Sequence, residues 1–326
     1  MSAAEGFDDV HRRVRAQAFV ESLQDAICDA LEAVERASGG DARFREDRWR
    51  RADGQATTPV DLGGGRSRVL EGGVVLEKAG VNVSAVYGPV PDAVKGQMPG
   101  DGPSFFATGV SLVLHPHNPH APTTHANFRY IERYGGDAAP VGWFGGGADL
   151  TPYVLYEDDA RHFHAVLRDA CAVGQVEDPT AGPTRYQRFK RWCDEYFRNT
   201  HRDEARGVGG VFFDHLRGPD MAGLEAFWRA SGAAFLPAYL PILERRKDLA
   251  YDDALRHWQL VRRGRYVEFN LLHDRGTKFG LQTHGRIESI LMSLPPLVRW
   301  DYDRRPESGS AEADLYETYL KPRDWA

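Results

Sequence analysis

Four of the twelve histidines in this 326-residue chain lie within eleven positions, in the stretch HPHNPHAPTTHAN that begins at His115 and ends at Asn127. An imidazole can ligate a metal ion, and it can also gain or lose a proton near neutral pH. The stretch is therefore compatible with a metal site, a proton-transfer site, an anion site or an exposed loop. The direction in which the flanking residues point decides among these.

Two predicted strands flank the stretch, and their alternation sorts the side chains into two groups. The strands are expected at 105–115 and 124–132, and the short proline-rich connection favours an antiparallel hairpin. A hairpin centred near His120 sets His115 opposite His125 and Ser111 opposite Arg129. A polar face of this kind indicates a ligand-binding cleft rather than an ordinary solvated surface. The polar face carries Ser111, His115, His125, Asn127 and Arg129, and the opposite face carries Leu112, Leu114, Phe128 and Tyr130.

The remaining histidines of interest divide into turn residues and helix residues. His117 and His120 lie between prolines of the connection and are expected to be exposed to solvent. His164 and His201 continue apolar rows of two predicted helices. Each of these two is either a core histidine with satisfied hydrogen bonds or a contribution from a helix to the same site as His115 and His125.

A second dense stretch, GRYVEFNLLHDRGTKFGLQTHGRIES, begins at Gly264. Asp274 and Arg275 follow a strand predicted at 265–272, and active-site groups often collect at such ends. Gly285 allows a sharp turn, and Arg286 opens the helix expected at 286–293. A second candidate carboxylate, Asp149, follows three glycines in WFGGGADLTP, which matches neither common nucleotide-binding pattern. Those glycines favour the close approach of another backbone or of a flat ligand.

Hydrophobic periodicity predicts the elements that position these residues. Further strands are expected at 74–87, 142–150 and 208–216, and further helices at 8–37, 158–171, 183–206, 220–233, 237–248 and 250–262. The Pro/Gly-rich segment 88–103 is interpreted as an insertion within one domain. Because strands and helices come in blocks, the chain is expected to be one α+β domain over residues 1–326, with a mostly antiparallel sheet. A loop or flexible tail is expected after about residue 303.

Composition narrows the classes of partner and compartment. The net charge of −6 argues against a nucleic-acid partner. The chain lacks an apolar run near the roughly 18 residues of a membrane span, and its polar start predicts a cytoplasmic location. Its three cysteines lack CxxC spacing, so neither a disulfide framework nor a zinc ribbon is expected. The excess of arginine over lysine reflects either codon bias or the recognition of carboxylates.

Five stretches together resemble one family, the oxygen-dependent coproporphyrinogen III oxidases. They are GVSLVLHPHNPHAPTTHANFRY, WFGGGADLTPY, KRWCDEYFRNTHRDEARGVGGVFFDHL, YLPILERRKD and RRGRYVEFNLLHDRGTKFGLQTHGRIESILMSLPPLVRWDY. They occur in the order of the family, between about residue 74 and residue 302. A match of this length is too extensive to be a chance motif.

The resemblance implies a fold, a reaction and a set of roles. It implies an antiparallel sheet covered on both faces by helices, in a homodimer whose interface includes about 266–301. The implied reaction converts two propionates of coproporphyrinogen III to vinyl groups, giving protoporphyrinogen IX, carbon dioxide and peroxide, with O2 as acceptor and with neither flavin nor haem. His125 is implied as proton donor. The implied substrate contacts are Ser111, Asn127, Phe128, Arg129, Gly285 and Arg286, and the histidines linked to a divalent metal cation are His115, His125, His164 and His201.

The residues themselves give reasons for such a substrate. A tetrapyrrole with four carboxylates suits arginines such as Arg275, which can bind a carboxylate with two hydrogen bonds. An aspartate near the centre of the ring can accept pyrrole N–H groups or a pyrrole proton, and Asp274 is the first candidate for it, with Asp149 second. Two alternatives stay open from the residues alone. A non-haem metal oxygenase would usually need two histidines and a carboxylate, and a non-catalytic tetrapyrrole carrier would not need Asp274.

Overall fold

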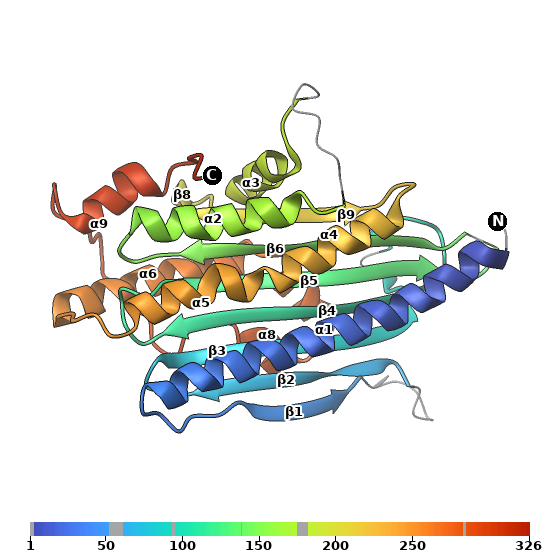
Figure 1. The fold of residues 1–326 in the computed structure, drawn as a ribbon, viewed down its shortest axis with the longest axis horizontal. Coiled ribbons are helices and arrows are strands. Elements are labelled where there is room, and N and C mark those ends of the chain that lie inside the picture. The colour runs from blue at the N-terminus through green and yellow to red at the C-terminus, as the bar shows by residue number, and fades with distance from the viewer. Residues whose placement is uncertain (1–2, 52–60, 93–94, 138, 175–181, 283–284) are drawn as a thin grey trace.

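One antiparallel sheet of seven strands forms the centre of the protein, as the computed structural model in Figure 1 shows; the described residues are 3–51, 61–92, 95–137, 139–174, 182–282 and 285–326. The strands follow the order β1-β2-β3-β4-β5-β6-β9, so the sheet is a meander as far as β6. This arrangement confirms the predicted α+β class. The strands are β1 (Arg45–Arg50), β2 (Gly63–Glu71), β3 (Leu76–Pro89), β4 (Ser104–Pro116), β5 (Thr123–Tyr134), β6 (Val141–Thr151) and β9 (Gly209–Leu216).

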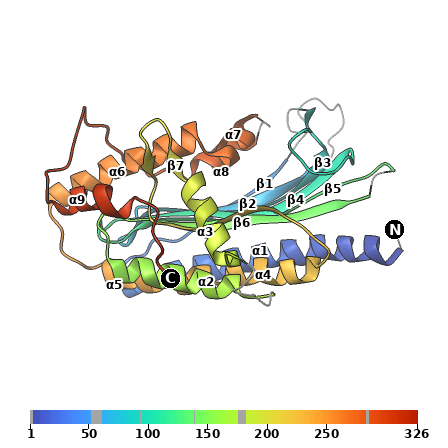
Figure 2. The same cartoon turned by 90° about the horizontal axis from the view of Figure 1, so that it is seen from above.

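Helices cover both faces of the sheet, as Figure 2 shows. One face lies under α1 (Ala3–Ala37), α2 (Glu157–Cys171), α4 (Met221–Ala233) and α5 (Phe235–Arg246). The other lies under α6 (Asp253–Leu272), α7 (Arg275–Gln282) and α8 (Ile287–Leu291). The main core belongs to the first face, where the strands direct Val81, Leu112 and Phe128, each at most 1% exposed, toward the helices. Burying these apolar side chains supplies most of the driving force for the sheet to pack against α1 and α5.

The hairpin of β4 and β5 has the predicted direction but a register shifted by two residues. Ser111 pairs with Asn127 and Val113 with His125, so the hairpin is centred near residue 119. A shift of two residues keeps every side chain on its original face, because side chains alternate with a period of two. The predicted polar and apolar faces are therefore both confirmed, although His115 and His125 are not directly opposite each other.

Two predicted elements differ from the structure. The segment 265–272, predicted as a strand, is the second half of the 20-residue helix α6. Its β-branched and aromatic residues are buried at helical spacing, with Tyr266 and Phe269 against the sheet, so tertiary packing overrides their strand propensity. The helix predicted at 183–206 ends ten residues early, as α3 (Arg185–Tyr196). The chain then forms the small hairpin of β7 (Arg198–Asn199) and β8 (Glu204–Ala205), which turns at Asp203 with a φ of 53°.

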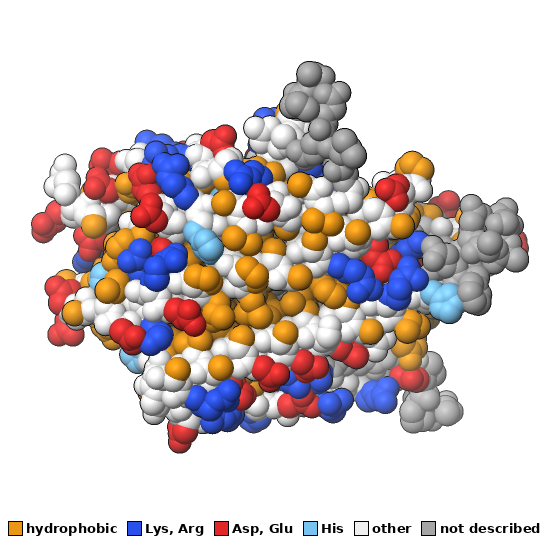
Figure 3. Space-filling view, in the orientation of Figure 1, with side chains coloured by type: hydrophobic (Ala, Val, Ile, Leu, Met, Phe, Trp, Pro, Cys, Tyr) orange, Lys and Arg blue, Asp and Glu red, His pale blue; other side chains and the backbone are white. Residues whose placement is uncertain are grey.

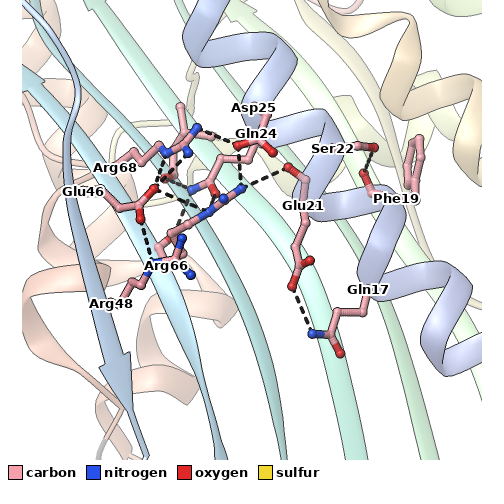
Figure 4. Close-up of polar contacts among 11 residues, drawn as sticks. Gln17, Phe19, Glu21, Ser22, Gln24, Asp25, Glu46, Arg48, Arg66 and Arg68 are labelled. Atoms are coloured by element: carbon pink, nitrogen blue, oxygen red, sulfur yellow. Dashed lines mark hydrogen bonds and ion pairs between the residues drawn. The ribbon is translucent and has the colours of Figure 1, made fainter.

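Charged residues attach the edge of the sheet to the N-terminal helix, as Figure 4 shows. Arg66 on β2 reaches Asp25 on α1 at 2.7 Å, and Arg68 reaches both Asp25 and Glu46 at 2.8 Å. The amide of Gln24 donates to the backbone carbonyls of Arg66 and Val81 at 2.8 and 2.7 Å. The strands β1 and β2 were not predicted, because their charged and glycine-rich sequences lack the usual strand signal.

The C-terminal segment packs onto the domain, although a loop or flexible tail is predicted there. It forms α9 (Ala311–Asp314) and the π-helix η3 (Leu315–Tyr319), and Trp325 is 3% exposed. Cys28, Cys171 and Cys193 are free and buried. Among the described residues, none of the helices combines the length and apolar character needed to cross a bilayer.

Candidate active site

A row of small and polar side chains crosses the sheet face that lies under α6, α7 and α8. Residues that pair directly in antiparallel strands project on the same side of the sheet. Successive pairing therefore sets one residue of each strand side by side on this face, which we call the polar face. The row consists of Asp47, Ser67, Asn82, Ser111, Asn127 and Gly147, and it ends at the aromatic Phe212 on the edge strand β9. A surface without bulky side chains in its middle can accept a broad, flat ligand.

Arg129 lies in the next row of the polar face and is held by two neighbours. Its guanidinium donates to the Asn127 side-chain oxygen at 2.8 Å and pairs with Asp214 at 2.8 Å. Glycine is needed beneath it, since a Cβ at Gly145 would lie 2.8 Å from Arg129 Nε and 2.7 Å from an Asp214 oxygen. Gly145 on β6 thus makes room for the side chains of Arg129 and Asp214. The Arg129 side chain stays 26% exposed, so it remains accessible to an anion.

His125 is oriented by a buried carboxylate and a buried arginine. Its Nδ1 atom donates to Asp149 Oδ1 at 2.9 Å, and Arg206 donates to the same carboxylate at 2.7 Å. Burial opposes ionisation of Asp149, but the charges of Arg206 and His125 and their hydrogen bonds hold its pKa below the ordinary value. A carboxylate can only accept, so the Nδ1 proton is fixed. The Nε2 atom of the ring, whose side chain is 20% exposed, is directed away from this pair.

Arg206 is enclosed by aromatic rings. Its guanidinium carbon lies 4.0 Å from the centre of the Phe197 ring, 4.7 Å from that of Phe269 and 4.9 Å from that of Tyr266. The Phe197 ring also meets the His125 ring at 5.6 Å. This desolvated surrounding strengthens the pairing of Arg206 with Asp149. Sequence reasoning missed Arg206, because the predicted helix 183–206 ended at this residue and gave no partner for its guanidinium.

Asp274 lies at the start of α7, and its hydrogen bond with Tyr196 links it to the aromatic residue Phe212 of the polar face. One oxygen accepts from the Tyr196 hydroxyl at 2.9 Å and the other from the Thr277 amide at 2.7 Å. Tyr196 stacks on Phe212 of the polar face with ring centres 4.3 Å apart. Burial by itself raises the pKa of Asp274, but the hydrogen bonds from Thr277 and Tyr196 outweigh it and lower the pKa below the ordinary value. Asp274 is therefore an ionised hydrogen-bond acceptor.

The other two predicted arginines lie at opposite sides of this region. The guanidinium of Arg275 lies over the Tyr196 ring, 4.8 Å from its centre, and its side chain is exposed. Arg286 begins α8, donates to Ser289 Oγ at 3.2 Å and pairs with Asp47 on β1. Ser289 in turn contacts Ser67 of the polar row at 2.8 Å. The Gly285 amide donates to the Gly280 carbonyl at 2.7 Å.

The four histidines expected at one metal site are not brought together. His115 is fully buried, and its ring nitrogens contact Thr123 Oγ1 and the Ser293 carbonyl. His164 is buried in α2, on the other face of the sheet from His125, between the Tyr186 hydroxyl and the Val208 carbonyl. His201 lies in the turn between β7 and β8 and contacts His273 and Glu268 at 2.8 Å. Because these imidazoles neither converge nor leave lone pairs directed at one point, this donor set does not fit a metal ion.

The described residues contain no group of three or more His, Cys, Asp or Glu side chains arranged to hold a metal ion. His164 is instead the satisfied core histidine that the sequence left as its alternative. In the turn, His117 is exposed as predicted, but His120 is only partly exposed. The ring of His120 contacts the Tyr156 hydroxyl at 2.9 Å and the Ala250 carbonyl at 3.0 Å, because the loop before α6 packs against the turn.

Comparison with known proteins defines the class of enzyme. The family model for coproporphyrinogen III oxidase matches residues 15–325. A curated relative, the chloroplastic oxygen-dependent coproporphyrinogen-III oxidase of Glycine max, is 50% identical over 325 residues, which cover 96% of this chain and 79% of the relative. The chain belongs to the coproporphyrinogen III oxidase family. Its activity is the oxygen-dependent oxidation of coproporphyrinogen III in haem and porphyrin biosynthesis, with O2 as co-substrate.

Proposed function

We propose that the polar face binds coproporphyrinogen III and that the two propionates react beside His125. The observation that carries this proposal is the row of small and polar residues across the six strands β1 to β6, with Arg129 beside it and Asp274 linked to it through Tyr196 and Phe212. Ser111, Asn127 and Phe128 form the floor of the proposed site, with the Phe128 backbone as its contributing part because its side chain is in the core. The ring system lies flat on this floor, where bulky side chains would obstruct it.

The stoichiometry of the reaction defines the role proposed for His125. Each propionate loses its carboxylate as carbon dioxide and one hydrogen from the carbon next to the pyrrole, and the two electrons pass to O2. Forming hydrogen peroxide from that O2 takes up the lost hydrogen and one further proton. An imidazole can supply that proton near neutral pH. Asp149 supports this role, since its carboxylate accepts from Nδ1, holds the ring in place and leaves Nε2 for the oxygen product.

Asp274 is proposed as the acceptor for pyrrole N–H groups. Its lowered pKa keeps it ionised, so it can accept a hydrogen bond from a pyrrole N–H group. Such a hydrogen bond would make the ring more electron-rich and so more reactive toward O2. Asp149, the second candidate, already bonds His125 and Arg206 and is 1% exposed, which favours Asp274 for this role.

Arg129, Arg275 and Arg286 are proposed to bind the substrate carboxylates. Each guanidinium offers several N–H donors in a plane that matches a carboxylate. Arg129 and Arg286 are paired with Asp214 and Asp47, so a substrate carboxylate would compete with, or add to, an existing ion pair. Such pairing holds the guanidinium in place before the substrate arrives, which lowers the entropy cost of binding.

Turnover of purified protein with coproporphyrinogen III, in air and under argon, tests these roles. Asp274→Asn is expected to keep most of the substrate affinity and to lose most of the turnover. His125→Asn is expected to retain the contact with Asp149 and to lose turnover, because it cannot deliver a proton. His117→Ala is the matched control, an exposed histidine of the same turn region. Near-normal turnover in Asp274→Asn would contradict the proposed role of Asp274 as the acceptor for pyrrole N–H groups.

A divalent metal cation receives no role in this proposal. The four histidines implied as ligands lie apart and are already hydrogen-bonded. Turnover is therefore proposed to depend on the protein groups and O2. A metal-stripped preparation with undiminished turnover would support this proposal, and turnover restored only by one added divalent ion would contradict it.

A homodimer is proposed, with an interface that includes about residues 266–301. Large apolar side chains are exposed along this stretch, and exposed apolar patches of this kind often mark subunit contacts. They are Leu271, Leu272, Leu281, Ile287, Leu297 and Trp300. Sedimentation is expected to give about twice the chain mass of 36.4 kDa. Leu272→Lys is expected to shift it to one chain mass.

Val14→Lys is the matched control for that experiment. Val14 is 64% exposed on α1, which belongs to the opposite covering layer, where apolar side chains also gather across the middle of the face (Figure 3). A monomeric mass for the unmodified protein, or dissociation by Val14→Lys alone, would contradict the proposed interface.

A cytoplasmic location is proposed, with a plastid as the alternative given the chloroplastic relative. Three free cysteines suit a reducing compartment. Cell fractionation with an antibody against this chain distinguishes the two.

A further inference from the structure

His115 ends a chain of buried hydrogen bonds whose direction is fixed. Its Nε2 atom lies 2.9 Å from the Ser293 carbonyl oxygen, which can only accept, so Nε2 carries a proton. The ring is fully buried. Its Nδ1 atom lies 3.1 Å from the Thr123 hydroxyl, and the other end of the chain fixes the direction of that contact.

That end is Arg263 on α6, whose Nε can only donate and lies 3.4 Å from the Tyr153 hydroxyl oxygen. The Tyr153 proton therefore points to the Thr123 hydroxyl oxygen, 2.5 Å away. The Thr123 proton is then left for His115 Nδ1. Arg263 is fully buried, pairs with Glu77 and donates to the Pro116 carbonyl at 2.8 Å. Every donor from Arg263 to His115 thus points the same way, toward Ser293.

The acceptor at the end of this chain belongs to the segment that carries Arg286. Ser293 follows α8, and its hydroxyl donates to the Ile290 carbonyl at 2.9 Å. The start of α8 is held separately, by Arg286 with Asp47 and by Ser289 with Ser67. Between them, Met292 lies over Gly80, where an added Cβ would come within 3.2 Å of it. The contact from His115 is therefore the attachment of the C-terminal end of α8 to β4.

We infer that His115 is a positioning residue, which receives a directed series of hydrogen bonds from Arg263 through Tyr153 and Thr123 and fixes α8 over the polar face. Through α8 it contributes to the position of Arg286, which the pairing with Asp47 also holds. Both ring nitrogens are used in this role, so His115 has no lone pair to offer a metal ion. The role of Arg286 toward the substrate rests on the proposed function, whereas the attachment of α8 does not.

Three variants of the full-length protein test the inference, with two readouts. His115→Gln can still donate to Ser293 and accept from Thr123, whereas His115→Ala can do neither. Thr123→Val removes the donor to Nδ1 without touching His115. The readouts are amide hydrogen exchange of the peptide covering 286–293, and the KM and kcat for coproporphyrinogen III. His117→Ala, two positions away and exposed, is the control.

Faster exchange and a KM about tenfold higher are expected for His115→Ala, the size of effect that loss of a buried hydrogen bond produces, with kcat changed less. Thr123→Val is expected to act in the same direction but less strongly, because Nε2 can still donate. His115→Gln is expected to restore both readouts to within about threefold. Metal analysis of the unmodified protein and of His115→Gln is expected to give the same content.

Failure of His115→Gln to restore either readout would overturn the inference, as would a bound metal ion that this variant loses. Unchanged amide hydrogen exchange of residues 286–293 in Thr123→Val would contradict the directed series of hydrogen bonds. Arg286→Ala tests the substrate contact of Arg286 separately from the attachment of α8. An unchanged KM in that variant, alongside the expected exchange pattern, would reject the substrate contact of Arg286 and leave the attachment of α8 supported.

Discussion

Mild acid is expected to destabilise this protein through its buried histidines. His164 is fully buried between Tyr186 and Val208, and burial, with Lys190 nearby, lowers its pKa to about 3. His115 has a pKa of about 3 for the corresponding reason. In the unfolded chain both return to an ordinary pKa of about 6.5. Unfolding therefore takes up protons below pH 6.5, and the free energy of unfolding falls as the pH is lowered through this window.

The size of the effect follows from the width of the window. Each histidine that is neutral in the native state and protonated in the unfolded state costs about 1.4 kcal/mol per pH unit below 6.5. Between pH 7 and pH 5 this gives about 2 kcal/mol for each histidine and about 4 kcal/mol for the pair. Carboxylates such as Glu268, whose pKa is lowered to about 2, stabilise the protein until the pH nears their unfolded value of about 4.3, so they contribute little above pH 5.

Urea unfolding at pH 7 and pH 5 measures this loss. His164→Gln removes one of the two histidines and keeps a side chain able to hydrogen-bond. The variant is expected to be less stable at pH 7, yet to lose about 2 kcal/mol less than the unmodified protein on acidification. The protein concentration must be held constant, since a dimer would make stability depend on it. An equal loss in both proteins would refute the reasoning, because it would mean that His164 is already able to take up a proton in the native state.

Three further outcomes are expected. Gly145→Ala would displace Arg129 and Asp214 at the atoms its Cβ approaches, so KM should rise several-fold with little change in melting temperature, and an unchanged KM would contradict the proposed carboxylate contact. Arg206→Leu leaves the buried Asp149 without its cation and should cost about 3–5 kcal/mol in urea unfolding, whereas a loss below about 1 kcal/mol would mean that the pair contributes little. Prolonged dialysis against a chelator should leave turnover unchanged, and loss of turnover would show that the reaction needs a metal ion.

The strand faces around the histidine stretch could be predicted because alternation survives errors in register. The hairpin was centred one residue away from its position, yet Ser111, His125 and Arg129 all lie on the expected face. Local sequence gave a wrong prediction at 265–272, where the β-branched and aromatic residues of RYVEFNLL are typical of a strand. There the buried residues Arg262, Tyr266 and Phe269 follow a spacing of three and four, which continues the helix from Asp253.

Long-range partners could not be predicted from local sequence. Nothing near Arg206 in sequence indicates that it pairs with Asp149, 57 residues away, beneath three aromatic rings. His201 was expected on a helix because the apolar row of α3 continues to it, but the chain leaves the helix at Phe197, whose carbonyl accepts from the Arg206 amide. The grouping of four histidines failed for the same reason, since periodicity assigns a helix face without assigning the side of the sheet that the helix covers.

The edge strand β1 gives the two ends of the polar face unequal local stability. The His125 end lies among central strands, where hydrogen exchange normally requires opening close to global unfolding. The Arg286 end depends on Asp47 in β1, which pairs with one neighbouring strand and is linked to α1 through the charged residues in Figure 4. Salt weakens such exposed ion pairs. Raising the ionic strength should therefore loosen one end of the substrate surface while the proton-transfer end stays rigid, so substrate affinity should respond to salt before the chemical step does.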